Sequence, residues 1–137
     1  MKLGLEEIQL INALDSIARV SAKDCFVDKK TVVYLVPKNK LRQAIGKNGK
    51  TVQEMREKLR KNIELFEYSE KPEDFLKKAF HKAVIEEVEI KETKEKKIAI
   101  VKADAENKKL ILRNLGRLNK IKELVKRNYS INEIRIR

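Results

Sequence analysis

The sequence has one cysteine, one histidine and no tryptophan, and none of its apolar runs is long enough to span a membrane. Cys25 therefore cannot form an internal disulfide, and Cys25 and His81 alone do not make a metal cluster. A membrane helix needs about 20 consecutive apolar residues, and the first twenty residues also lack the pattern of a signal peptide. We expect a cytoplasmic protein with no membrane partner, no metal ion and no cofactor.

The residue groupings that usually carry catalysis are also missing. The sequence contains no carboxylate cluster and no histidine pair, and its one glycine-rich turn lacks the spacing and the Ser/Thr of a nucleotide-binding P-loop. Glu86, Glu87 and Glu89 alternate with other residues as they would along the exposed edge of a strand. We predict no catalytic residues. The rival class, a nuclease, would be revealed by metal-dependent cleavage of RNA.

Acidic residues are comparatively few, 21 against 33 lysines and arginines, which gives a net charge of +12. That charge on so small a chain favours a polyanionic partner, with nucleic acid first and an anionic membrane surface second. Residues 38–61 carry nine basic and two acidic side chains, and residues 104–127 carry eight and three. The excess positive charge therefore lies in two short segments, while the remaining residues balance.

Apolar spacing predicts the order of helices and strands. Helices are expected at residues 3–20, 38–45, 51–61 and 73–80, and strands at residues 25–27, 31–36, 63–68, 84–90 and 97–101. Thr51 and Glu54 resemble a capping box at the start of the third helix. The acidic, proline-containing segment at residues 69–74 marks a boundary between domains at residues 1–70 and 71–137.

The chain repeats itself. With an offset of 66 residues and no gaps, residues 32–68 superimpose on residues 98–134, and the apolar register is kept although few residues are identical. Each copy is predicted to contain a helix, two strands, a helix, a tight turn, a helix and a strand. This order indicates an α+β fold in which helices cover one face of a three-stranded sheet.

The tight turn of the first copy is rich in glycine in a glycine-poor chain. Two of only four glycines, Gly46 and Gly49, lie three residues apart, and Lys47, Asn48 and Lys50 accompany them. Residues 46–49 are called the glycine loop below. Such a turn often does no more than join two helices. Because the net positive charge gathers around it in both copies, we favour a loop that admits the phosphate backbone of a nucleic acid.

A helix, the Gly-Lys-Asn-Gly loop and a second amphipathic helix together resemble the nucleic-acid-binding motif of KH domains, and the element order is that of the type II KH fold. Two tandem copies, with the segments at residues 24–28 and 67–75, are similar to the small archaeal NusA-like transcription factors. The resemblance covers essentially the whole chain. It implies a protein that binds single-stranded RNA in transcription termination or antitermination, with RNA polymerase or the elongation complex as a partner. We expect the protein to be a monomer.

The resemblance and the charge together select a set of candidate RNA-binding residues. They are Lys40, Arg42, Ile45, Gly46, Lys47, Asn48, Gly49, Lys50, Val52 and Arg56. Gly46 and Gly49 would allow close approach of the RNA backbone, and the cations would contact phosphates. Ile45 and Val52 would form the apolar surface on which bases lie, and main-chain groups near residues 62–65 would read base edges.

The second copy departs from the motif. The glycine loop superimposes on residues 112–115, where leucines replace both glycines, and the copy's only glycine, Gly116, lies one position late. This unit either binds RNA weakly or only extends a basic surface. A one-residue slip would restore half the motif, but it would disturb the apolar register. The secondary RNA-binding candidates are Lys108, Lys109, Arg113, Asn114, Gly116 and Arg117.

Two further readings of the function stay open at this stage. A ribosomal or ribosome-assembly protein could use the same KH surface, and it would sediment with small ribosomal subunits. A protein-interaction module without RNA binding would show negligible affinity for RNA even at low salt.

Overall fold

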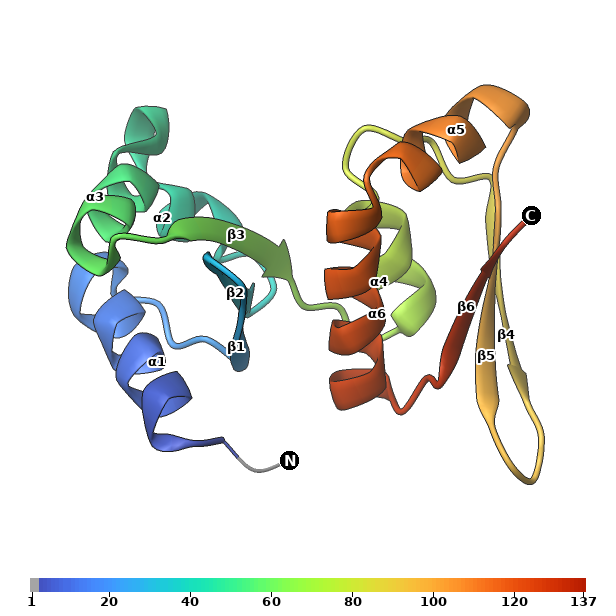
Figure 1. The fold of residues 1–137 in the computed structure, drawn as a ribbon, viewed down its shortest axis with the longest axis horizontal. Helices are drawn as coiled ribbons and strands as arrows, with labels where there is room; N and C mark the ends of the chain where they lie inside the picture. The colour runs from blue at the N-terminus through green and yellow to red at the C-terminus, as the bar shows by residue number, and fades with distance from the viewer. Residues whose placement is uncertain (1–2) are drawn as a thin grey trace. The chain divides into compact units, whose positions relative to one another are not determined.

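The β-branched and aromatic run at residues 31–36 forms the middle strand of one of two sheets (Figure 1). The structure is a computed structural model and describes residues 3–137. The chain divides into two units, Met1–Ser69 and Glu70–Arg137. The first contains α1 (Leu5–Ala18), β1 (Asp24–Asp28), β2 (Thr31–Val36), α2 (Leu41–Ile45), the 3-10 turn η1 (Lys47–Gly49), α3 (Lys50–Leu59) and β3 (Asn62–Glu67). The second contains α4 (Pro72–Ala79), β4 (Glu87–Glu92), β5 (Lys97–Lys102), α5 (Ala105–Arg113), α6 (Leu115–Tyr129) and β6 (Glu133–Ile136).

Both sheets have three strands and the same mixed pairing. In the first, β2 lies in the middle, antiparallel to β1 and parallel to β3. In the second, β5 lies in the middle, antiparallel to β4 and parallel to β6. A parallel neighbour requires a crossover connection, and the helix pairs α2–α3 and α5–α6 provide it. The α+β fold class expected from the repeat is confirmed.

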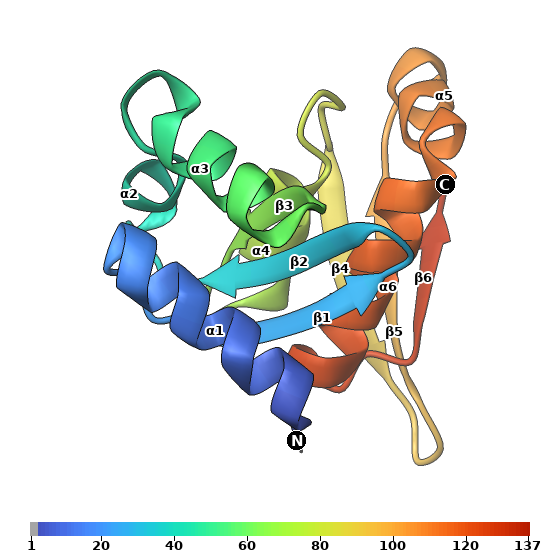
Figure 2. The same ribbon diagram turned by 60° about the vertical axis from the view of Figure 1, so that its left-hand side comes forward.

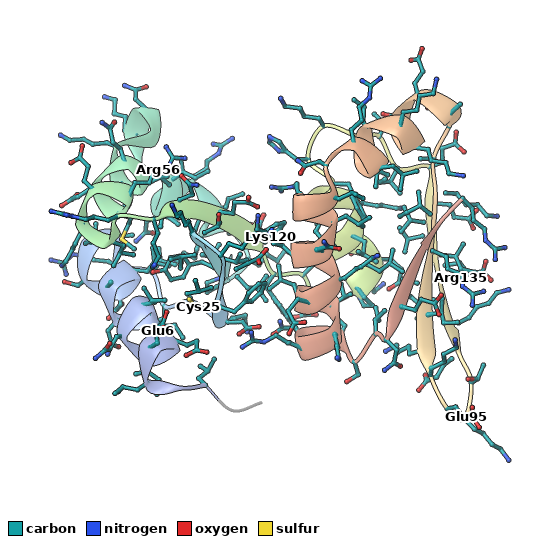
Figure 3. All side chains as sticks on the ribbon, in the orientation of Figure 1. Glu6, Cys25, Arg56, Glu95, Lys120 and Arg135 are labelled. Carbon is teal, nitrogen blue, oxygen red and sulfur yellow. The ribbon has the colours of Figure 1, made fainter. Side chains whose placement is uncertain are left out.

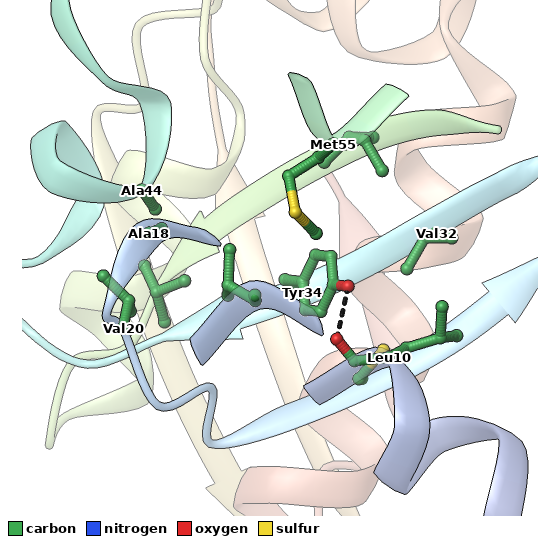
Figure 4. Close-up of a cluster of buried hydrophobic side chains, with 11 residues drawn as sticks. Leu10, Ala18, Val20, Val32, Tyr34, Ala44 and Met55 are labelled. Carbon is green, nitrogen blue, oxygen red and sulfur yellow. Dashed lines mark hydrogen bonds between the residues drawn. The ribbon is translucent and has the colours of Figure 1, made fainter. Parts of the chain in front are cut away.

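The core of the first unit lies between its sheet and its helices. Figure 2 shows α1 alongside β1 and β2. Leu14 from α1, Val32 and Tyr34 from β2, Ala44 from α2 and Met55 from α3 all belong to one cluster of buried side chains (Figure 4). This packing fixes both helices that flank the glycine loop. In the second unit, α4 and α6 lie side by side on the sheet (Figure 1), and the rings of Phe75 and Tyr129 lie 5.4 Å apart.

A hydrogen bond from the Tyr34 side chain lies within the core of the first unit. The Tyr34 hydroxyl donates to the carbonyl oxygen of Leu10 at 2.6 Å (Figure 4). Burial, with a smaller contribution from Cys25, raises the pKa of Tyr34 well above its ordinary value, so the hydroxyl stays a donor. We expect Tyr34→Phe to lower the free energy of unfolding by about 1 kcal/mol, since a buried carbonyl loses a partner. Urea denaturation would check this, and an unchanged midpoint at constant slope would contradict it.

Two local expectations are wrong. The capping box does not form, because α3 begins at Lys50 with Gly49 as its N-cap, and no side chain caps it. The gapless repeat also fails within α6, because this helix continues to Tyr129. In the first unit Val32 pairs with Ile63, so the 66-residue offset predicts that Ile98 pairs with Tyr129. In the structure, Ile98 pairs with Glu133 of β6 instead. The second copy thus contains an additional turn of helix before its last strand.

Within the described chain, no helix combines the length and the apolar character that crossing a bilayer would require.

Candidate nucleic-acid interface

The glycine loop adopts a conformation that needs its glycines. Gly46 has φ 80° and ψ 165°, a region essentially closed to residues with a side chain, and Gly49 has φ 73° and ψ 13°. Asn48 between them also has a positive φ of 56°, which asparagine tolerates better than most residues. The sequence marked Asn48 only as a candidate RNA-binding residue. Its backbone conformation adds a structural reason for asparagine at this position.

The two glycines have different surroundings. A Cβ atom on Gly46 would lie 2.7 Å from the backbone nitrogen of Thr51 and would overlap the Thr51 hydroxyl, whereas one on Gly49 would meet nothing within 4 Å. Gly46 is therefore needed for packing within the loop as well as for its backbone angle. Gly49 is needed for its backbone angle and leaves open space on its outer side.

Hydrogen bonds close the loop and leave its tip exposed. The backbone N–H groups of Gly46 and Gly49 donate to the carbonyls of Arg42 and Gly46, at 2.8 and 3.1 Å, and Lys50 N–H donates to Lys47. None of these bonds uses the N–H of Lys47 or Asn48, and both side chains are exposed. The loop thus presents a cation and two backbone amides that are suited to an anion.

A side chain that the sequence did not single out ties the loop to the rest of its unit. The Nε2 atom of Gln43 in α2 donates to the carbonyl oxygens of Ala18 and Arg19 at the end of α1, at 3.0 and 3.1 Å. Ala44 beside it is fully buried. Helix α2 has only five residues, so these contacts replace the stability that a longer helix would provide. No motif in the sequence signals this role of Gln43.

The remaining candidates of the first unit surround the loop. Lys40, Arg42 and Lys50 are exposed, Ile45 is 37% exposed, and Val52 is half-buried at the start of α3. Arg56 extends from α3 (Figure 3). It also contributes to a shallow depression of about 280 Å³ lined by Lys30, Arg56, Arg60, Lys61 and Asn62, none of which is acidic. A basic surface therefore runs along α3 from its first residue to the turn before β3.

The second unit has no loop at the corresponding place. Helix α5 continues through Leu112 and Arg113, Asn114 alone separates it from α6, and α6 begins at Leu115. The Oδ1 atom of Asn114 accepts from the backbone N–H of Arg117 at 3.1 Å and caps α6. Gly116 lies inside α6, so the one-residue slip considered from the sequence does not occur. Among the other secondary candidates, Lys109 and Arg113 are exposed, and Lys108 and Arg117 are half-buried.

The charge at the start of the helix that precedes the loop position, α2 in the first unit and α5 in the second, also differs between the units. Asp104 caps α5 by accepting from the backbone N–H of Asn107 at 2.8 Å, and this bond holds the pKa of Asp104 below its ordinary value. Glu106 follows in the first turn of α5. The residues at the same repeat positions in the first unit are Lys38 and Lys40. The second unit therefore places negative charge where the first presents cations.

Known proteins with similar sequences and structures are available for comparison. KH domain sequences match residues 11–70. Two proteins called probable transcription termination protein NusA are similar to nearly the whole chain. The one from Halococcus morrhuae is 30% identical over 99% of both chains, and the one from Methanocaldococcus jannaschii is 26% identical over 99% of this chain and 75% of its own. The crystal structure of APE1850 covers 98% of this chain and all of its own, with 28% identity and a TM-score of 0.90.

Proposed function

Because the chain belongs to the archaeal NusA-like family of KH domain proteins, we propose that it binds single-stranded RNA and acts in transcription termination or antitermination. The observation that carries the proposal is the glycine loop, with its three positive φ angles and exposed Lys47, placed at the centre of the positive charge of its unit. The proposal involves no catalytic step.

The loop and its flanking helices suggest a division of roles. Lys47 and Lys50 neutralise phosphates. Gly49 has no side chain and open space on its outer side, which lets the RNA backbone approach. Ile45 and Val52 offer apolar contact to the bases. Strand β3 is an edge strand that pairs only with β2 among the described strands, and we assign the contact with base edges to its main chain. Sequence preference would then depend on backbone geometry more than on side-chain identity.

Binding of this kind should weaken steeply as salt rises. If Lys47, Lys50 and two flanking arginines neutralise about four phosphates, affinity should fall about 50-fold between 50 and 200 mM KCl, because single-stranded nucleic acids release about 0.7 counterions per phosphate contact. Fluorescence anisotropy of a labelled single-stranded RNA would measure the slope, with an RNA duplex of equal length as the control. An affinity that does not change with salt would contradict the phosphate-centred interface.

The family relationship favours transcription over translation as the setting. The relatives that span the whole chain carry the name of a transcription termination protein. We therefore expect the tagged protein to co-purify from cells with RNA polymerase and with nascent RNA. Co-sedimentation with small ribosomal subunits instead would favour the ribosomal alternative, and crosslinking followed by sequencing of the bound RNA would separate the two.

A further inference from the structure

Three leucines are exposed where the second unit lacks the glycine loop. Leu110, Leu112 and Leu115, here called the leucine tip, are 42%, 44% and 57% exposed. Leu112 and Leu115 occupy the repeat positions of Gly46 and Gly49. Of the described chain's large apolar residues only a few are this exposed, and three of them lie within six positions here. All three lie in the last turn of α5 or the first turn of α6, and exposed apolar side chains gathered at one end of a unit are a feature of protein interaction sites.

A cavity of about 400 Å³ opens within the second unit beside Leu110, the one leucine of the tip that lines it. This volume is within the range of about 300–1,000 Å³ that accommodates ligand groups in proteins. It is lined by Phe80, His81, Lys82, Ala83, Leu110, Ile111, Asn114, Arg117 and Leu118. Its lining combines an apolar floor with the cations Lys82 and Arg117, and none of the lining residues is acidic.

The cavity follows from how the second copy differs from the first. Ala44, which is fully buried in the first unit, corresponds to the larger and exposed Leu110. The segment before β4 spans residues 80–86, while residues 19–23 suffice before β1. Hydrogen bonds hold both ends of this longer segment in place. Arg117 Nε donates to the carbonyl of Ala79, the last residue of α4, at 2.9 Å. Val84 N–H donates to Asn107 Oδ1 and Glu86 N–H to the Lys102 carbonyl, both at 2.9 Å. The cavity is therefore preformed.

RNA is a poor match for this surface. The helical leucines Leu112 and Leu115 prevent the close approach of a phosphate backbone that Gly46 and Gly49 allow. An apolar side chain of a protein, by contrast, would gain from burial against Leu110 and Leu118, while nearby Arg113 and Lys109 would attract acidic residues on either side of it.

We propose that the leucine tip and the adjoining cavity bind an acidic protein segment that inserts one large apolar side chain. The surface is then a protein-docking site on the same chain whose first unit carries the glycine loop. The inference does not depend on RNA binding by the first unit, because it rests on the exposed leucines, the cavity and the positive charge of the second.

The chain's lack of tryptophan provides a direct test. A fluorescein-labelled peptide of about ten residues, all Glu and Asp except one central Trp, is titrated with the full-length protein. We expect saturable binding by anisotropy and a blue shift of the tryptophan emission as the indole enters the cavity. The same peptide with Ser in place of Trp, or with Lys in place of the acids, should bind at least about tenfold more weakly.

Two variants test whether the peptide binds at the leucine tip. Leu115→Asp should lower its affinity at least about tenfold, whereas Leu5→Asp, the same change at a more exposed leucine in α1, should leave it within about twofold. Circular dichroism would confirm that both variants fold. In NMR spectra, adding the peptide should change the chemical shifts of the backbone amides of residues 80–84 and 110–118.

Three outcomes would overturn the proposal: equal binding of the Ser peptide, equal loss with Leu5→Asp, or shifts centred on the glycine loop. Shifts of residues 110–118 produced by single-stranded RNA and not by the peptide would instead assign this surface to nucleic acid. Loss of RNA binding in a glycine-loop variant would leave the peptide result unchanged, so the two proposals fail separately.

Discussion

Replacement of Lys47 and Asn48 together by aspartate is expected to lower the affinity for single-stranded RNA about 100-fold while the protein stays folded, a loss of about 2.7 kcal/mol of binding free energy. Both side chains are exposed at the tip of the glycine loop, so neither contributes to a core. The double change turns one phosphate-binding cation into an anion and adds a second negative charge beside it. Aspartate also tolerates the positive φ of residue 48, so the loop conformation should persist.

The second unit supplies a control with the same change in charge. Arg113→Asp with Asn114→Asp alters the net charge by the same amount at the corresponding repeat positions, and α6 would remain capped because aspartate is as good an N-cap residue as asparagine. We expect this control to lose less than about fivefold in RNA affinity. Equal losses would show that only total charge matters, and a larger loss in the control would show that the second unit is the main RNA-binding surface. Anisotropy titrations with circular dichroism on each variant would decide.

Much of the fold could be predicted, because it depends on local sequence patterns. The run at residues 31–36 forms β2 with the same bounds, because a β-branched and aromatic segment buried in a sheet has few alternatives. The internal repeat correctly indicated the two three-stranded sheets, since the same apolar spacing needs the same partners. The placement of charge identified the segments that form the basic surface, although only Arg56 of the residues that line its depression was among the candidates.

The features that the sequence missed depend on geometry between distant residues. Gln43 reaches the end of α1, more than twenty positions earlier, and an exposed amide in a short helix gives no hint of this. The extra turn of α6 was hidden by the coincidence that Asn128 and Glu133 match Asn62 and Glu67 at the 66-residue offset. No local pattern specifies the pairing of β6 with β5, and this pairing places β6 about one helical turn later in the sequence than the 66-residue offset predicts. Likewise the cavity beside Leu110 arises only when residues 80–83 pack near α5 and α6.

The two loop glycines should respond differently to the smallest possible substitution. Gly46→Ala should lower the free energy of unfolding by about 3 kcal/mol, because alanine is strained at φ 80° and ψ 165° and its methyl group would collide with the Thr51 backbone. Gly49→Ala should cost only about 1 kcal/mol, the price of a left-handed conformation with open space around the new methyl group.

RNA affinity separates the two roles further. Gly49→Ala keeps the loop folded but places a methyl group on its open outer side, so RNA affinity should fall about tenfold with little loss of stability if phosphates approach there. Gly49→Asn, which suits the left-handed conformation, should restore stability but not affinity. Urea denaturation and anisotropy on the same samples would measure both quantities. If Gly49→Ala bound RNA as tightly as the unaltered chain, the RNA backbone would have to contact the loop through Lys47 and Asn48 alone.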